Sequence, residues 1–101
     1  MSVLVMVELP GTQAEKFLEV YGRHAARLDE TAGGRSAGAL HHMFVANENG
    51  TVLVVDEWTS REAFEAFAAT SDEIRAVLAE VGLSAPPVTT AYRVLETSDR
   101  F

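Results

Sequence analysis

Apolar residues fall along the chain in two patterns, namely short Val-rich runs and longer stretches with a helical period. The first run, Val3–Leu9, stops at Pro10–Gly11, and an apolar run bounded by turn formers is typical of a β-strand. Two further runs, 39–46 and 51–58, flank an Asn-Glu-Asn-Gly segment, which indicates a β-hairpin. A fourth run, 88–96, follows a Pro-Pro pair. The sequence therefore predicts four strands.

Between the strands, apolar residues recur at three- and four-residue steps, which is the period of a helix with one buried face. The first such stripe comprises Phe17, Tyr21, His24 and Leu28. The second comprises Phe64, Phe67, Ala68, Ile74, Val77, Leu78 and Val81. The first helix is expected to end at Gly33–Gly34. A Thr three residues before a Glu predicts N-terminal caps at Thr12, Thr59 and Thr70.

The order strand, helix, hairpin, helix, strand is that of the split βαβ motif of ferredoxin-like domains. Right-handed crossovers would place the helices on one face of an antiparallel sheet. We therefore expect an α+β fold of βαββαβ type. Residues 1–96 are expected to form one domain and residues 97–101 a loose C-terminal tail, from which Phe101 could dock on a neighbour.

The predicted strands are apolar on both faces, although helices can cover only one of them. In the second strand, one face is predicted to carry Leu40, His42 and Phe44, and the other Ala39, His41, Met43 and Val45. The third strand has Val52 and Val54 on one face, and Leu53 and Val55 on the other. A second copy of the chain is the expected cover of the free face, which predicts a homodimer.

Composition narrows the classes of function. The chain has 8 Lys and Arg against 15 Asp and Glu, a net charge of −7, so a nucleic-acid partner is not expected. It contains no Cys, which excludes disulfides and thiolate metal sites. No apolar run is long enough to cross a membrane, and the N-terminus reads directly into a strand rather than a signal sequence. The cytoplasm is the expected location, and a neutral aromatic small molecule the expected ligand.

His41 and His42 are the first candidates for chemistry, because histidine is the natural general base near neutral pH. Successive strand residues face opposite sides of a sheet, so the two imidazoles cannot share one substrate. His42 has the pattern of the helix-covered face, and His41 that of the face toward the expected partner. Each could instead be an ordinary hydrogen-bonded core or interface histidine.

Asp56 and Trp58 lie two residues apart in the third strand and therefore share a face. A buried carboxylate is costly unless it is paired, so Asp56 is either a site residue or the partner of a cation. The hairpin register would place Asp56 beside His42, which makes these two residues the candidate catalytic pair. Trp58 could form the wall of an aromatic pocket or fill the strand–helix corner.

Four further residues are candidates for contact with an aromatic ligand. Tyr21 and His24 lie on the inward stripe of the first helix, where they could also simply pack in the core. Phe67 has the spacing of a core residue and would wall a pocket if one is present. Tyr92, in the last strand, could donate a hydrogen bond into the pocket or across a dimer.

Two segments, AGALHH (37–42) and VVDEWTSREAF (54–64), resemble the antibiotic-biosynthesis-monooxygenase family, and strand order and spacing match over about residues 2–96. The resemblance implies a dimeric α/β barrel with a pocket between sheet and helices. Family members include cofactor-free monooxygenases that turn aromatic phenols or anthrones into quinones, haem-degrading enzymes, and proteins of unknown activity. The haem branch uses a first-strand Asn that has no counterpart here, and Val77 stands near the position of its axial His. Haem degradation is therefore disfavoured.

The resemblance implies a small cofactor-independent monooxygenase that uses O₂ as co-substrate and binds no metal. His42 would be the base and Asp56 the residue that could orient it, and the pocket would be completed by Tyr21, His24, Trp58, Phe67 and Tyr92. Whether the chain is an enzyme stays open. The alternatives are a non-catalytic dimer that binds a small molecule, a polyketide cyclase or isomerase on the same scaffold, and a structural dimer whose pocket is filled by its own side chains.

Overall fold

The computed structural model describes residues 1–30 and 34–101, and a four-stranded sheet forms its centre. The strands are β1 (Val3–Leu9), β2 (Ala39–Ala46), β3 (Val52–Trp58) and β4 (Val88–Arg93). The helices are α1 (Ala14–Glu30), α2 (Gly34–Ala37), α3 (Arg61–Thr70) and α4 (Asp72–Val81). The strand order is β2-β3-β1-β4 and every neighbouring pair is antiparallel. The predicted ferredoxin-like α+β fold is confirmed.

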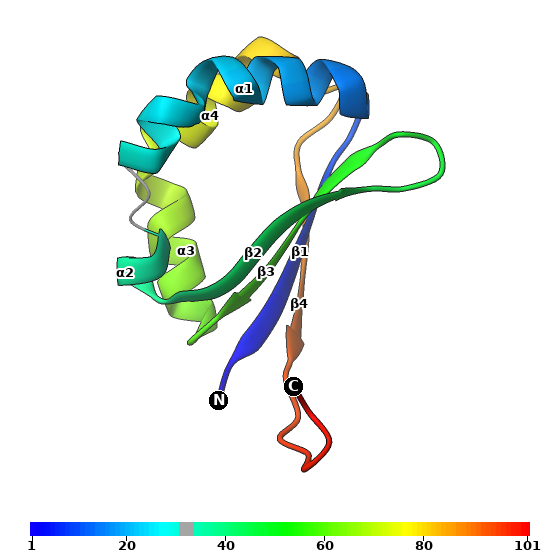
Figure 1. Cartoon of the computed structure of the whole chain (residues 1–101). Helices are drawn as coiled ribbons and strands as arrows, with labels where there is room; N and C mark the ends of the chain where they lie inside the picture. The colour runs from blue at the N-terminus through cyan, green and yellow to red at the C-terminus, as the bar shows by residue number, and fades with distance from the viewer. Residues whose placement is uncertain (31–33) are drawn as a thin grey trace.

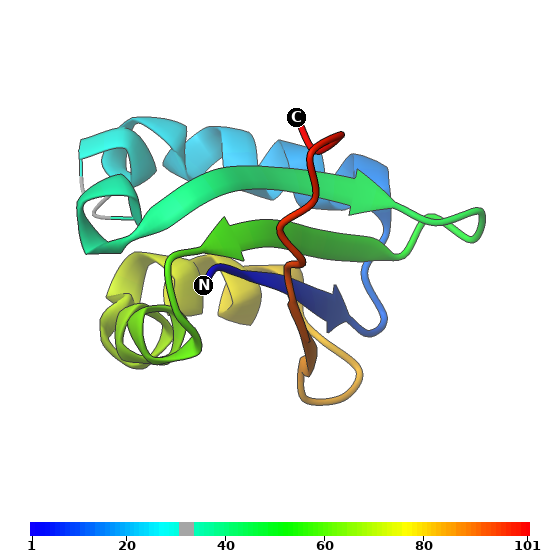
Figure 2. The same cartoon turned by 90° about the horizontal axis from the view of Figure 1, so that it is seen from below.

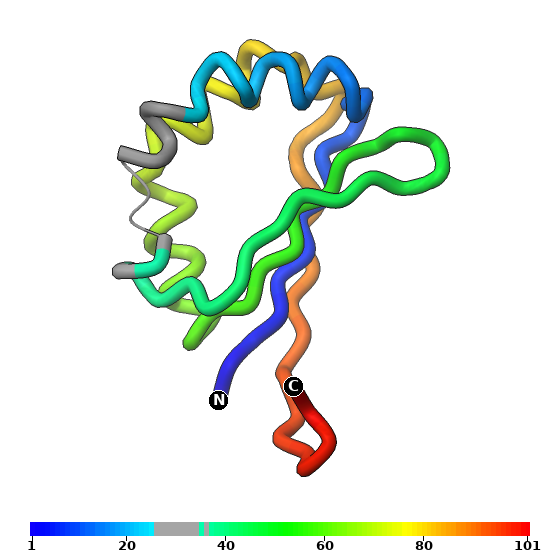
Figure 3. The backbone as a smooth tube through the Cα atoms, in the orientation of Figure 1, coloured from blue at the N-terminus to red at the C-terminus, as the bar shows by residue number. Residues whose placement is uncertain are grey.

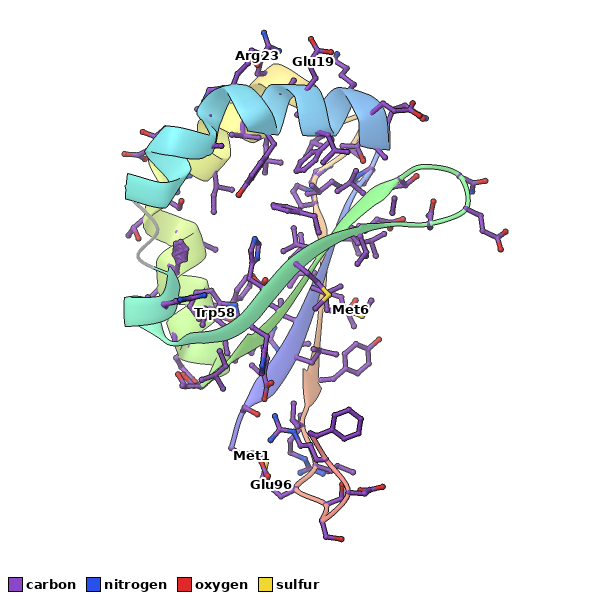
Figure 4. The ribbon with its side chains drawn as sticks, viewed as in Figure 1. Met1, Met6, Glu19, Arg23, Trp58 and Glu96 are labelled. Carbon is purple, nitrogen blue, oxygen red and sulfur yellow. The ribbon has the colours of Figure 1, made fainter. Side chains whose placement is uncertain are left out.

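The helices form an arc along one face of the sheet, and no helix covers the other face in the part of the chain that the structure describes (Figure 1). We call these the helix face and the open face. Strand register assigns Val5, Asp56 and Trp58 to the helix face and Met6 to the open face. Figure 4 shows Trp58 on the side toward the helices and Met6 on the opposite side of the sheet.

The main core lies between the sheet and the pair of helices α1 and α4. Its buried members are Leu9, Phe17, Val20, Val52, Val77 and Val81. Each buried side chain of this kind stabilises the fold by about 1.5–3 kcal/mol relative to an exposed position. A second cluster lies under α3, where Trp58 packs on Phe64 and Phe67 with ring centroids 5.8 and 5.4 Å apart. This second cluster brings the end of β3 and α3 together beside the candidate site.

The hairpin between β2 and β3 is formed as predicted and projects beyond the sheet (Figure 3). The side chain of Asn47 accepts the backbone N–H groups of Asn49 and Thr51, at 2.9 and 3.1 Å. Gly50 adopts a φ of +81°, in the left-handed region that favours glycine. This turn sets the register of the two strands that carry His42 and Asp56.

The three predicted helix caps are wrong, and Thr12 shows why pattern alone misleads. Its buried hydroxyl donates to the Leu9 carbonyl at 2.7 Å and accepts the Val52 N–H at 2.9 Å. Thr12 therefore ties β1 to β3 instead of capping a helix, and α1 begins at Ala14. The expected end of that helix at Gly33–Gly34 falls partly outside the described residues, since Gly33 is not described and Gly34 begins α2.

The other two caps are displaced by one residue. Ser60, not Thr59, caps α3, because its side chain accepts the Ala63 N–H at 3.1 Å. Thr70 is the last residue of α3, and its hydroxyl bonds back to carbonyls in the preceding turn. Ser71 separates the two helices and occupies the N-cap position of α4.

Strand β2 contains an irregularity at Leu40. Ala39 pairs with Trp58 whereas His41 pairs with Glu57, so Leu40 is an extra residue on its strand, as in a β-bulge. The prediction that Leu40 lies on the helix face is wrong, because Leu40 is exposed and borders the open face together with His41 and Glu57. The bulge places the small Ala39 opposite the indole of Trp58.

The C-terminal residues 97–101 run back toward β3 on the open face (Figure 2). Arg100 forms an ion pair with Glu57 of β3. The N–H of Val94 bonds the Ser2 carbonyl at 3.0 Å, which continues the pairing of the two chain ends beyond β4. Among the described residues, no helix is both long and apolar enough to span a membrane.

Candidate active site

His42 and Asp56 lie directly opposite each other on β2 and β3. The Nδ1 atom of His42 is 2.6 Å from Oδ1 of Asp56. Because an ionised carboxylate can only accept hydrogen bonds, we assign the imidazole proton to Nδ1, which leaves the lone pair on Nε2. The expected juxtaposition of the two side chains is thus present, and the pair has the geometry of a general base oriented by a carboxylate.

Trp58 bonds the second oxygen of the Asp56 carboxylate. Its indole Nε1–H donates to Oδ2 at 3.1 Å, so both carboxylate oxygens have a partner. These bonds offset the cost of burying the acid, which is 7% exposed. Trp58 itself is 3% exposed and therefore lies beneath the site, where it has little surface left to contact a ligand.

Aromatic rings extend from His42 along the helix face toward α1. His42 lies edge-on to Phe44, with ring centroids 4.9 Å apart. Phe44 in turn contacts Phe17 and Tyr21, at 4.9 and 5.0 Å. On the other side, Phe67 of α3 packs on the indole of Trp58. We call Phe17, Tyr21, Phe44 and Phe67 the aromatic arc. Phe17 is buried in the core, and the partly exposed rings of Tyr21, Phe44 and Phe67 provide faces and edges that suit a flat aromatic molecule.

His42 remains accessible although helices cover its face of the sheet. Its side chain is 49% exposed, whereas that of Asp56 is 10% exposed. The carboxylate is thus withdrawn from solvent while the imidazole can meet a ligand. A base on a rigid strand, held by a buried acid, is the kind of support that a catalytic group needs.

Two candidate residues lie away from this pair. His24 sits between α1 and α4, where its Nε2 is 3.6 Å from Oε1 of Glu80. Tyr92 pairs with Leu4 on the open face and is 52% exposed. The β4 register therefore directs Tyr92 to the side of the sheet opposite His42 of the same chain, and a hydrogen bond across a dimer stays the prediction for this residue.

A second polar cluster, which the sequence reasoning missed, lies on the open face around Glu57. Ser2 Oγ donates to Glu57 Oε2 at 2.6 Å, and His41 Nδ1 lies 2.9 Å from Glu57 Oε1. Arg100 adds an ion pair from the C-terminal segment. We call these four residues the open-face cluster. The hairpin register could have paired His41 with Glu57, but no sequence signal links residue 100 to β3.

The contacts of the open-face cluster lower the pKa of Glu57 below its ordinary value. The Ser2 hydroxyl is the largest cause, followed by His41 and by the positive charge of Arg100, while burial opposes them by favouring the neutral acid. Glu57 is therefore a stabilising anion on the open face. Among the described residues, no group of three or more His, Cys, Asp or Glu is placed to hold a metal ion.

The family model of antibiotic biosynthesis monooxygenases matches residues 1–80. This chain belongs to that family. A comparison with curated proteins finds no sequence match.

Solved structures with the same architecture include monooxygenases. The ActVA-Orf6 monooxygenase of Streptomyces coelicolor, in complex with nanaomycin D, has a TM-score of 0.71 and 22% identity, covering 95% of this chain and 89% of that one. SnoaB, a cofactor-independent oxygenase from Streptomyces nogalater, has a TM-score of 0.60 and 14% identity, covering 98% and 97%. Rv0793 from Mycobacterium tuberculosis has a TM-score of 0.60 and 18% identity, covering 98% and 100%. At these identities the likeness establishes the fold alone.

Proposed function

We propose that the chain is a cofactor-independent oxygenase that converts an aromatic phenol or anthrone into a quinone with O₂. The observation that carries the proposal is the hydrogen bond between His42 and the buried Asp56, beside the aromatic arc on the helix face. Family membership supports an oxygenase, and SnoaB is an example of one that needs no cofactor. The ligand in the ActVA-Orf6 structure, nanaomycin D, supports a small-molecule site on this fold.

The chain's own contribution begins with proton transfer. Nε2 of His42 accepts a proton from the substrate, and Asp56 stabilises the imidazolium through the Nδ1–H bond. The electron-rich anion then passes an electron to O₂, and the resulting radicals combine to a peroxide anion. This anion takes the proton back from the His42 imidazolium and becomes a hydroperoxide. Loss of water from the hydroperoxide gives the quinone, so one oxygen atom enters the product and the other leaves as water.

The aromatic arc orients the substrate. Tyr21, Phe44 and Phe67 are partly buried, which leaves part of each ring accessible. Phe44 contacts both the imidazole of His42 and Tyr21, and Phe67 contacts Trp58, which bonds the same carboxylate as His42. A flat substrate would stack on these rings with its acidic C–H or O–H toward Nε2. Holding the reacting atoms in this geometry removes much of the entropic barrier.

A second copy of the chain is proposed to cover the open face. No helix of the described residues covers this face, and it exposes the apolar side chains of Leu40, Met43, Val45 and Tyr92. A hollow of about 550 Å³ also lies there, between the sheet and the C-terminal segment. Several exposed apolar side chains on one face of a sheet are typical of an interface between molecules. A symmetric dimer would bury it and leave both helix faces free for substrate.

The proposed activity is tested by oxygen uptake. Purified, metal-free protein is mixed with a panel of anthrones, naphthols and hydroquinones, and O₂ consumption and quinone formation are followed together. We expect one O₂ consumed for each quinone formed from an anthrone or naphthol, and no turnover without O₂. Turnover under anaerobic conditions would show a cyclase or isomerase instead. Saturable binding without O₂ consumption would show a binding protein, and either result contradicts the oxygenase.

A further inference from the structure

Trp58 supplies the hydrogen bond that complements the bond between Asp56 and His42. Its indole N–H donates to Oδ2, and His42 meets Oδ1 of the same carboxylate. The three side chains thus form a row from the end of β3 to the accessible imidazole. Its order is indole, carboxylate, imidazole.

The indole is the most firmly held member of this row. Trp58 is 3% exposed and contacts Phe64 and Phe67 of α3. Its partner on β2 is Ala39. Without the bulge, regular pairing would place the larger Leu40 opposite Trp58. The contacts with α3 therefore hold the indole ring and, with it, the direction of the N–H.

A carboxylate needs such an anchor to present one oxygen steadily. The terminal torsion of an Asp side chain is broad, so an unanchored carboxylate turns easily about it. A donor fixed on Oδ2 selects the orientation in which Oδ1 points at His42. That orientation keeps the imidazole proton on Nδ1 and the lone pair on Nε2.

We propose that Trp58 is a positioning residue, whose indole N–H orients Asp56 and thereby sets the tautomer of His42. The proposal deepens the proposed oxygenase function and rests on it for its catalytic consequence. Its structural content does not depend on any substrate. Loss of the N–H would leave the aromatic arc in place but would free the carboxylate and lower the share of His42 that carries its lone pair on Nε2.

The tautomer of His42 is measured by nitrogen NMR of the ligand-free protein, at a pH where the imidazole is neutral. Trp58→Phe removes the N–H and keeps an aromatic ring. A second variant carries 3-benzothienylalanine at position 58, in which sulfur replaces the N–H without loss of volume. Phe64→Leu is the packing control, because it weakens the contact with Trp58 but leaves the bond to Asp56.

We expect the Nδ1–H form to dominate in the wild type and in Phe64→Leu. Both Trp58 variants should shift the ratio of tautomers toward the Nε2–H form by about tenfold, the effect of one hydrogen bond. An unchanged ratio in the benzothienyl variant would overturn the proposal, whether or not Trp58→Phe folds. So would an equal shift in Phe64→Leu, because the effect would then come from packing.

Kinetics separate this inference from the proposed activity. With an active substrate, the benzothienyl variant should show kcat lowered by about tenfold at unchanged KM, since the base is weakened while the ring contacts persist. A wild type that consumes no O₂ refutes the oxygenase but leaves the tautomer result to decide on Trp58. An unchanged tautomer in an active enzyme refutes only the role of Trp58.

Discussion

The two faces of the sheet carry the same pair of functional groups in different settings. On the helix face His42 meets Asp56, and on the open face His41 meets Glu57. Each imidazole uses Nδ1 toward its carboxylate. The settings differ in the other partners of the acid. Asp56 receives a neutral indole N–H, whereas Glu57 receives the Ser2 hydroxyl and the positive charge of Arg100.

This difference indicates which pair is suited to proton transfer. The charge of Glu57 is already balanced by Arg100, so Glu57 would stabilise an imidazolium on His41 less strongly. The charge of Asp56 has no such competitor in the contacts described, and it can stabilise the imidazolium of His42. The side chain of His41 is also 71% exposed, on the face without the aromatic arc. The further partner of the carboxylate thus decides whether a His–carboxylate pair is suited to act as a base or serves only to stabilise the structure.

The largest effect should come from removing the ring beneath the helix-face pair. Trp58→Ala deletes a buried aromatic side chain and should lower the free energy of unfolding by about 3–5 kcal/mol. Met43→Ala, on the open face, should instead change how stability depends on protein concentration, because its contacts would lie in the dimer. Urea unfolding at several concentrations measures both. A loss in Met43→Ala that is equally large and independent of concentration would contradict the distinction between the faces.

The second effect concerns the two acids and turnover. Asp56→Asn should lower kcat by roughly 10- to 100-fold, because it replaces a charge-assisted hydrogen bond to His42 by a neutral one. Glu57→Gln is the matched control on the same strand, and it should leave kcat within about twofold of the wild type. Steady-state oxygen uptake gives both values. Equal losses in the two variants would mean that the faces are not functionally distinct.

A third effect is the pH dependence of stability. The pKa of Glu57 is lower in the folded chain than its ordinary value of 4.5, so Glu57 stabilises the fold fully above that pH. The stabilisation is lost as the pH falls through the lowered pKa of the folded state. Glu57→Gln should cost about 1 kcal/mol at neutral pH and should flatten the decline of stability in acid. Thermal unfolding from pH 7 to pH 3 tests this, and parallel curves for both proteins would contradict it.

The smallest effect is the difference in stability between the ion pair of the C-terminal segment and an ordinary surface ion pair. Arg100→Ala should lower the free energy of unfolding by about 0.5–1 kcal/mol, since its guanidinium is partly exposed but its partner Glu57 is buried. Arg61→Ala breaks the exposed pair with Glu65 and should cost no more than about 0.5 kcal/mol. Denaturant unfolding compares the two. A larger loss in Arg61→Ala would show that residues 97–101 are not held by Glu57.

Much of the fold could be predicted because its signals are local. Val-rich runs, the Asn-Gly turn and the helical stripes determine the order of the elements, and the turn also determines the register that joins His42 to Asp56. The shared face of Asp56 and Trp58 follows from strand alternation alone. The pair and its indole partner were therefore within reach of sequence reasoning.

Other features depend on contacts between distant segments. No pattern in the sequence predicts the bulge at Leu40. It lies where the start of β2 pairs with the end of β3. The face of Tyr92 depends on its pairing with Leu4, because β4 shows no clear alternation of apolar and polar residues. The ion pair of Arg100 joins residues 43 positions apart. The hydroxyl of Thr12 is used by Val52, so the expected cap could not form.

The most direct test of the account compares the two adjacent histidines. His41→Ala and His42→Ala differ from each other only in which face of the sheet loses its imidazole. With a substrate that the wild type oxidises, oxygen uptake should fall at least about 100-fold in His42→Ala, the usual contribution of a general base, and stay within about twofold in His41→Ala. Undiminished uptake in His42→Ala, or an equal loss in His41→Ala, would contradict the assignment of the base to the helix face.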